Sequence, residues 1–122
     1  MQVNSVPDHP AAAVTRVIIS TSDLTRALRL YRDVLGFAGE PSGETAMLGR
    51  PGSVMVMLHQ RATDPSDAAV AAAFSVDDLD QTVSAWTAAG GSVVDPPADQ
   101  PWGERMAVVR DTDGHIVCLI QR

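Results

Sequence analysis

Side chains that could hold a metal ion or act as a nucleophile are few and scattered along this sequence. The three histidines are His9 near the start, His59 after an apolar run, and His115 in a turn-like segment. The one cysteine, Cys118, lies in an apolar run without a neighbouring base, so we expect a buried, inert thiol. A single cysteine also excludes an internal disulfide, which favours a reducing, cytoplasmic location.

Other patterns that could carry catalysis have structural explanations. The stretch Gly49-Arg50-Pro51-Gly52 lacks the spacing and the lysine of a phosphate-binding loop, and it indicates a turn. No serine lies in a nucleophile elbow. Asp77 and Asp78 precede a segment of helical periodicity, where acidic residues favour a helix N-terminus. We therefore expect no catalytic residues of these classes.

Composition and charge limit the class of protein. The chain has 122 residues, the size of one ordinary domain, and is 45% apolar and 20% charged, as in globular proteins. All nine basic residues are arginines, they are scattered, and the net charge is −6, so we expect no nucleic-acid partner. No apolar run is long enough to span a bilayer, so we expect no membrane partner. Residues 1–12 lack the features of a signal peptide and predict a loose arm.

The elements that must position any site follow from periodicity. Residues 14–20 are β-branched and predict a strand. Thr21 or Ser22 can cap a helix with Asp23 in its first turn, and apolar residues then recur at helical spacing up to Gly36. Short strands are expected near 37–40, 44–49 and 53–60, followed by a linker over 61–69.

The second half repeats this order. A strand is expected over 70–76, a helix over 77–89 that ends at Gly90-Gly91, and strands near 91–95, 104–111 and 115–121. The last two strands are joined by Asp111-Thr112-Asp113-Gly114, a hairpin turn whose glycine permits positive φ.

The two halves match at a constant separation of 55 positions. The matching pairs are Ser20 with Ser75, Asp23 with Asp78, Leu24 with Leu79, Leu28 with Val83, Tyr31 with Trp86, and Gly36 with Gly91. Chance similarity between two amphipathic helices explains this less well, because a strand end, an acid at the helix start and a terminal glycine share one register. We predict an α+β fold of one domain, residues 1–122, with two βαβββ modules over about 14–60 and 70–121.

Several motifs carry a family resemblance over residues 14–121. They are Ser22-Asp23-Leu24, the stretch from Tyr31 to Phe37, the stretch from Phe74 to Leu79, and the tail segments 101–105 and 110–115. Together they resemble the vicinal oxygen chelate superfamily, the family of glyoxalases, bleomycin-resistance proteins and extradiol dioxygenases. The resemblance implies a curved, partly closed mixed sheet with helices outside, a cavity enclosed by paired modules, and a homodimer.

The resemblance also implies where a metal would bind. Enzymes of the family hold a divalent ion with four side chains, typically His, Gln or Glu, on the first and last strands of each module. By position these fall here on Arg16, Met57, Ala71 and Cys118. A guanidinium repels a cation, a methyl group has no donor, and a thioether with one thiol cannot build a site. A zinc pair of His59 and Cys118 would lack two ligands. We therefore expect no metal and no cofactor.

Side-chain alternation suggests what lines the cavity instead. If Met57 faces inward, so do Met55 and His59, and Arg16 and Cys118 face the same way. An inward Arg16 needs an oxygen partner, either from a ligand or from a carboxylate such as Asp111.

Four further positions have an open assignment between pocket and core. The facing of Met47 and Met106 is not fixed, and each suits either a variable ligand or a core gap. For Met47 the pocket is favoured, as for Met55 and Met57, because the three fall on consecutive strands near the expected metal position. Trp102 lies between Pro101 and Gly103 and could stack on a planar ligand or pack at the edge of the core. Phe37 could take either role, whereas Tyr31 and Trp86 are assigned to the core.

These features favour a non-enzymatic binding protein. It is similar to the metal-lacking branch of the family, which gives self-resistance by sequestering antibiotics of the bleomycin, mitomycin or enediyne type, and its partner would be a hydrophobic or planar small molecule. The alternative is a glyoxalase-like lyase, dioxygenase or epimerase, metal-dependent or with a relocated active site, for which His59 is the inward acid or base. A third reading is a subunit with a vestigial pocket.

Overall fold

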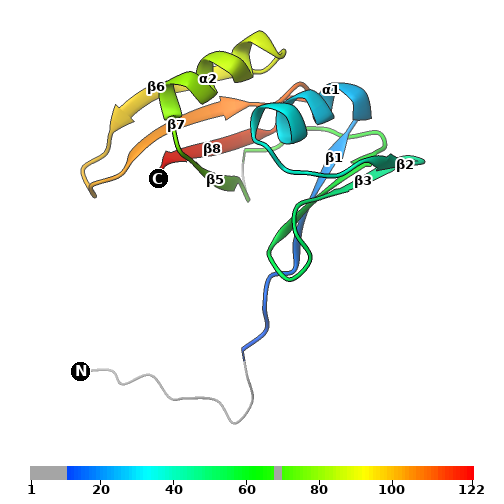
Figure 1. Cartoon of the computed structure of the whole chain (residues 1–122). Coiled ribbons are helices and arrows are strands. Elements are labelled where there is room, and N and C mark those ends of the chain that lie inside the picture. The colour runs from blue at the N-terminus through cyan, green and yellow to red at the C-terminus, as the bar shows by residue number, and fades with distance from the viewer. Residues whose placement is uncertain (1–10, 68–69) are drawn as a thin grey trace.

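Each half of the chain forms a four-stranded mixed sheet with a helical segment packed on one face (Figure 1). The computed structural model describes residues 11–67 and 70–122, so most of the arm expected over 1–12 lies outside the described residues. The α+β class and the two βαβββ modules are confirmed, but the two sheets are not closed into a barrel. Among the described residues, no helix is long and apolar enough to cross a membrane.

The first sheet places its first and last strands side by side. Its order is β1 (Arg16–Thr21), β4 (Met55–Gln60), β3 (Thr45–Leu48) and β2 (Pro41–Ser42), with β1 parallel to β4 and the other pairs antiparallel. The strand expected at 37–40 is wrong by a few residues. That segment lies against the sheet through a hydrogen bond from Gly49 N to Ala38 O (2.8 Å), and pairing in register begins only at Pro41.

The second sheet has the same order. It consists of β5 (Ala72–Val76), β8 (Ile116–Gln121), β7 (Arg105–Arg110) and β6 (Ser92–Asp99), with β5 parallel to β8. Strand β6 is longer than expected and runs through Pro96 and Pro97. It is an edge strand with register shifts on either side of Asp95, and an edge tolerates proline because the missing N–H is not needed on its outer side.

Equivalent aspartates start the two helices. In α1 (Leu24–Leu28) the carboxylate of Asp23 accepts from Arg26 N, and in α2 (Leu79–Ala88) that of Asp78 accepts from Gln81 N, both at 3.1 Å. The cap is therefore Asp23 rather than Thr21 or Ser22, whose side chains make other bonds.

The first helical segment contains one residue more than the second. It continues from α1 into a π-helical segment, η1 (Arg29–Val34), after which Leu35 N bonds to Leu30 O (2.9 Å), five residues back. The helix-ending glycines with positive φ are Gly36 (84°) and Gly90 (110°). Gly36 therefore corresponds in conformation to Gly90 and not, as the sequence match predicts, to Gly91.

Matched hydrogen bonds show that the duplication extends to side chains at the strand ends. The amide oxygen of Gln60, at the end of β4, accepts from Leu24 N (2.9 Å), and that of Gln121, at the end of β8, accepts from Leu79 N (2.8 Å). Each bond fixes the last strand of a module to the start of the helix in the same module. One residue further on, a second matched pair follows.

That second pair consists of arginines bonded to serines of the neighbouring first strand. Arg61 donates to Ser20 Oγ (2.7 Å), and Arg122 donates to Ser75 Oγ (3.3 Å). The two halves thus use the same polar contacts to join parallel strands, which supports an internal duplication more strongly than the sequence match alone.

The core lies between the sheets and the helices. The alternate strand residues that face the helices are buried, while the residues between them are half-buried or exposed. Tyr31 and Trp86 are both 0% exposed, as expected. The buried core residues of the strands are Ile19, Ala46, Leu48, Val56, Leu58, Val76, Ala107, Val109, Val117 and Leu119.

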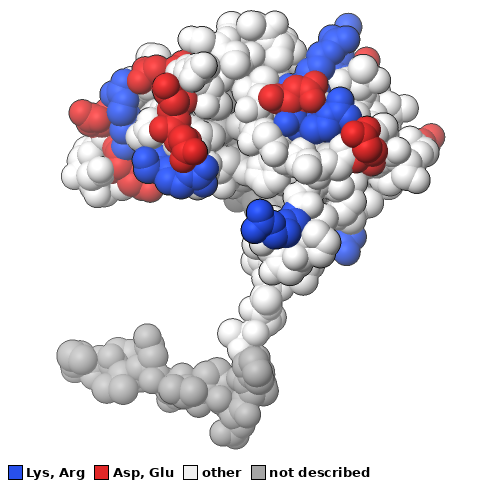
Figure 2. All heavy atoms as spheres, viewed as in Figure 1, with Lys and Arg blue, Asp and Glu red and all other residues white. Residues whose placement is uncertain are grey.

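On the surface, charges of both signs are interspersed over the face shown in Figure 2.

The turn between β7 and β8 docks on the first module. Asp113 accepts hydrogen bonds from the hydroxyl groups of Thr21 and Ser22 and from Ser22 N (2.7 Å). His115 Nε2 bonds to Ser20 O (2.8 Å), which requires the proton on that nitrogen. Partial burial raises the pKa of Asp113, but the hydrogen bonds from Ser22 and Thr21 outweigh it and lower the pKa below its usual value.

A buried pair completes this connection between modules. Tyr31 Oη donates to Asp111 Oδ2 (2.8 Å), and the other carboxylate oxygen accepts from the backbone N of Asp113 (3.0 Å) and His115 (2.9 Å). Burial raises the pKa of Asp111. It also raises the pKa of Tyr31, with a further rise from the neighbouring Asp111. The alternative that Asp111 pairs with Arg16 is therefore wrong.

Candidate ligand-binding site

The open face of the first sheet, opposite the helices, carries three half-buried methionines. Strand pairing sets Met47 opposite Met57 and Met57 opposite Ile18, so three apolar side chains form a row across β3, β4 and β1. Buried residues alternate with them in each strand. We call the surface formed by the alternate residues of these strands the thioether face: Arg16, Ile18, Ser20, Thr45, Met47, Met55, Met57 and His59.

Polar groups lie on both sides of this row, two residues away from it along the strands. Arg16 is exposed, lies opposite Met55, and has Nη1 3.8 Å from Met57 Sδ. His59 is half-buried between Ser20 and Thr45. The structure thus places Arg16, Met55, Met57 and His59 on one face, as alternation predicts, and adds Met47 to it.

The open face of the second sheet is also apolar. Strand pairing sets Met106 opposite Ile120 and Val108 opposite Cys118. Cys118 is half-buried rather than buried, and its pKa is raised by burial. A raised thiol pKa keeps the sulfur protonated near neutral pH, which makes the group a poor nucleophile.

Trp102 borders a cavity of about 490 Å³ on this second face, with Met106 and Val108 in its wall. The indole is 64% exposed and its Nε1 donates to Glu104 Oε1 (2.6 Å). Packing at the edge of the core, one of the two alternatives for Trp102, is therefore wrong. We call this site the Trp102 pocket; its other lining residues are Asp95, Pro96, Ala98 and Gln100.

Phe37 belongs neither to the thioether face nor to the Trp102 pocket. Its ring packs edge-to-face on Phe74, with ring centroids 5.5 Å apart, and both rings line a cavity of about 300 Å³ between the modules, together with Val17 and Ala73. Another cavity between the modules, of about 240 Å³, is lined in part by Tyr31 and His115. Sequence reasoning missed both cavities, because neither follows from one strand's alternation.

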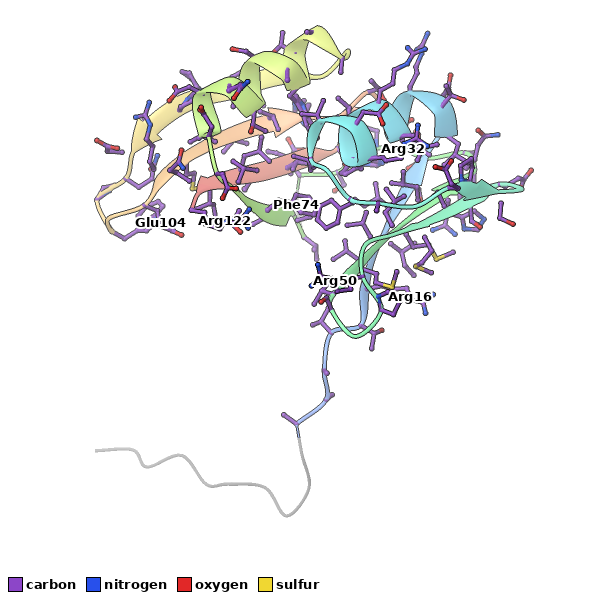
Figure 3. All side chains as sticks on the ribbon, viewed as in Figure 1. Arg16, Arg32, Arg50, Phe74, Glu104 and Arg122 are labelled. Carbon is purple, nitrogen blue, oxygen red and sulfur yellow. The ribbon has the colours of Figure 1, made fainter. Side chains whose placement is uncertain are left out.

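The candidate ligand-binding residues therefore lie in three separate places: the thioether face, the open face of the second sheet with the Trp102 pocket, and the cavity lined by Phe37. Figure 3 shows Arg16 at the start of β1, next to the β3–β4 hairpin of the first module, and Glu104, in the loop of Trp102, at the far end of the second module. Within residues 11–67 and 70–122, none of the three cavities described above is lined by both thioether-face methionines and Trp102.

Comparison with known families decides the identity of this fold. Residues 9–119 match the model of the Glyoxalase/Bleomycin resistance protein/Dioxygenase superfamily. The chain belongs to this superfamily. No curated protein matches the sequence significantly.

Solved structures of superfamily members have the same fold. A glyoxalase-related enzyme from Fulvimarina pelagi has a TM-score of 0.78 at 21% identity, over 92% of this chain and 89% of that one. A glyoxalase/bleomycin resistance protein/dioxygenase family enzyme from Burkholderia phytofirmans PsJN has a TM-score of 0.75 at 19% identity, covering 90% and 98%. A superfamily member from Sphaerobacter thermophilus DSM 20745 has a TM-score of 0.68 at 25% identity, covering 92% and 98%.

Strand pairing shows which residues lie next to Met57 and Cys118, two of the four expected metal positions. The direct neighbour of Met57 on β1 is Ile18, and that of Cys118 on β5 is Ala73, whereas Ala71 precedes β5. Whether Arg16 and Ala71 or Ile18 and Ala73 complete the set, the only metal donors are the thioether of Met57 and the protonated thiol of Cys118. These soft donors do not fit a hard divalent cation. Among the described residues, no three His, Cys, Asp or Glu side chains are placed so that they could hold a metal ion.

Proposed function

We propose that this protein is a non-enzymatic binder that sequesters a hydrophobic or planar natural product and so confers self-resistance. The observation that carries this proposal is the chemistry at the superfamily's metal positions. By the resemblance these positions are Arg16, Met57, Ala71 and Cys118. The direct strand neighbours of Met57 and Cys118 are Ile18 and Ala73, which offer no metal donor either. Thioethers are flexible and polarisable, and they contact aromatic rings favourably.

Sequestration needs no acid, base or electrophile at the site. The protein acts by mass action, holding the compound away from its target in the cytoplasm. Since none of the three described cavities is lined by both the thioether-face methionines and Trp102, we propose a homodimer in which the thioether face of one subunit and the Trp102 pocket of its partner contact the same ligand. This arrangement would bring together candidate residues that lie apart within one chain.

Thermal unfolding with a panel of antibiotics tests the binding function. Mitomycin C, bleomycin and an enediyne are the first probes, and binding to the native state raises its stability by about 2.7 kcal/mol at a ligand concentration 100 times Kd. We expect the melting temperature to rise with at least one of them. No shift with any antibiotic of a broad panel contradicts sequestration.

Metal analysis tests the alternative that the protein is a glyoxalase-like lyase, dioxygenase or epimerase. We expect purified protein to contain no stoichiometric metal, and its melting temperature to be unchanged by chelators. One Zn, Ni, Mn or Fe per subunit, removed by a chelator with loss of stability, would favour the enzyme instead.

A further inference from the structure

We infer that the thioether face selects ligands with a negative charge beside a flat apolar body, such as an aromatic carboxylate or sulfonate, and that Arg16 binds the anion. This inference rests on the proposed function of small-molecule binding and names the class of ligand. Figure 3 shows Arg16 beside methionine sulfur atoms of the first module.

The charges on the face are of one sign. Of the thioether-face residues, Arg16 carries a positive charge and none is acidic. Arg61 adds a second guanidinium at the edge, bonded to Ser20 Oγ at 2.7 Å. The whole chain has 15 acidic residues against nine arginines, so a face without a carboxylate departs from the charge of the rest of the molecule.

Arg16 also differs from the arginines that stabilise the surface. Five arginines form ion pairs with nearby carboxylates: Arg26, Arg32, Arg105, Arg110 and Arg122. In the described part of the chain Arg16 forms no such pair, and its one described side-chain acceptor is Met57 Sδ at 3.8 Å. A thioether is a weak acceptor, so most of the five N–H donors of this guanidinium remain available to an anion.

The spacing on the face fits an aromatic anion. Neighbouring strands lie about 4.8 Å apart, so the row of Ile18, Met57 and Met47 is about 10 Å wide, enough for two fused rings. Arg16 lies two residues from Ile18 along β1, a rise of about 7 Å. A ligand whose rings cover the row can therefore place a carboxylate or sulfonate against the guanidinium.

Binding of two matched fluorescent probes tests this inference. The anionic probe is 8-anilinonaphthalene-1-sulfonate, and the neutral one is N-phenyl-1-naphthylamine, which has the same rings without the sulfonate. We expect Arg16→Gln to weaken binding of the sulfonate by about fivefold to tenfold, as for loss of a charge-assisted hydrogen bond, and to leave binding of the neutral probe unchanged. Arg29→Gln is the control, since Arg29 is exposed on the helical layer and has the same charge.

A third variant locates the probes. Met57→Gln should weaken both probes, because it removes the central thioether of the row. If Arg16→Gln leaves the sulfonate affinity unchanged, or weakens both probes equally, anion selection by Arg16 is wrong while small-molecule binding stands. If Met57→Gln changes neither affinity, the probes bind elsewhere and the assignment of this face is wrong. If wild-type protein binds neither probe, the anion site on this face is wrong, whereas the proposed binding function is contradicted only if the antibiotic panel also gives no thermal shift.

Discussion

Tyr31 and Trp86 occupy equivalent positions in the two modules and pack against each other edge-to-face, with ring centroids 5.8 Å apart and an interplanar angle of 85°. Both side chains are fully buried. Each ring also carries a polar bond to the hairpin of the second module, from Tyr31 Oη to Asp111 and from Trp86 Nε1 to Arg110 O. The duplicated aromatic residue therefore joins the two halves and positions both sheets.

Tyr31→Phe should destabilise the protein by about 1–3 kcal/mol at neutral pH, because it removes a hydrogen bond to a buried carboxylate. Burial raises the pKa of Asp111, so the cost of its ionisation appears as the pH rises through that pKa and is absent below 3.8, its usual value. The Tyr31 bond reduces this cost. The difference between wild type and variant in urea unfolding should therefore grow from pH 3 to pH 7. A loss of equal size at both pH values would attribute the effect to packing.

Gly91→Ala should destabilise the fold by about 1–3 kcal/mol through overpacking. A Cβ at this position would overlap the indole of Trp86 and lie 2.9 Å from Arg110 O. Since Gly91 has no positive φ, the cause is contact and not backbone strain. Urea unfolding of Gly91→Ala, Trp86→Phe and the double variant measures the coupling. The double variant should lose less than the sum of the single losses, and strict additivity would contradict the overlap.

Properties fixed by local backbone geometry could be predicted from the sequence. Side chains alternate with period two, so placing Met57 on the open face also placed Met55 and His59. The repeat at 55 positions likewise predicted two modules with equivalent helix starts at Asp23 and Asp78.

Properties set by packing between elements could not be predicted in this way. The π-helical segment shifts the repeat by one residue between Tyr31 and Leu35, a change that apolar periodicity does not reveal. Similarly, alternation gave the facing of Met57 and Cys118 within their own strands but not the separation of the two sheets. The cavity between the modules that Phe37 lines depends on contact with Phe74 from the other module.

Asp113→Asn should weaken the connection between the modules. An amide cannot accept as well from the two hydroxyl groups and the backbone N–H that now bind the carboxylate, so we expect a loss of about 1–2 kcal/mol at pH 7, allowing for partial exposure. The pKa of Asp113 is lowered, so its contribution is present above 3.8 and is lost as the pH falls through the lower folded-state value.

The loss caused by Asp113→Asn should therefore shrink on acidification, as should that of Tyr31→Phe, although the pKa of Asp113 is lowered and that of Asp111 is raised. Urea unfolding at pH 7 and below pH 3.8 measures it, and Asp64→Asn, at an exposed position in the linker, is the matched control. A loss that stays constant with pH would show that the carboxylate charge does not stabilise this contact.

Trp102→Ala should weaken ligand binding while leaving the stability of the fold almost unchanged. The indole is 64% exposed, so its removal should change the free energy of unfolding by less than about 0.5 kcal/mol. As a stacked anchor in the Trp102 pocket it should contribute about 1–3 kcal/mol to binding of the antibiotic that gives the largest thermal shift. Trp102→Phe should keep most of the affinity because it retains a ring. Titration followed by ligand absorbance measures both variants, and an unchanged affinity of Trp102→Ala would remove this residue from the site.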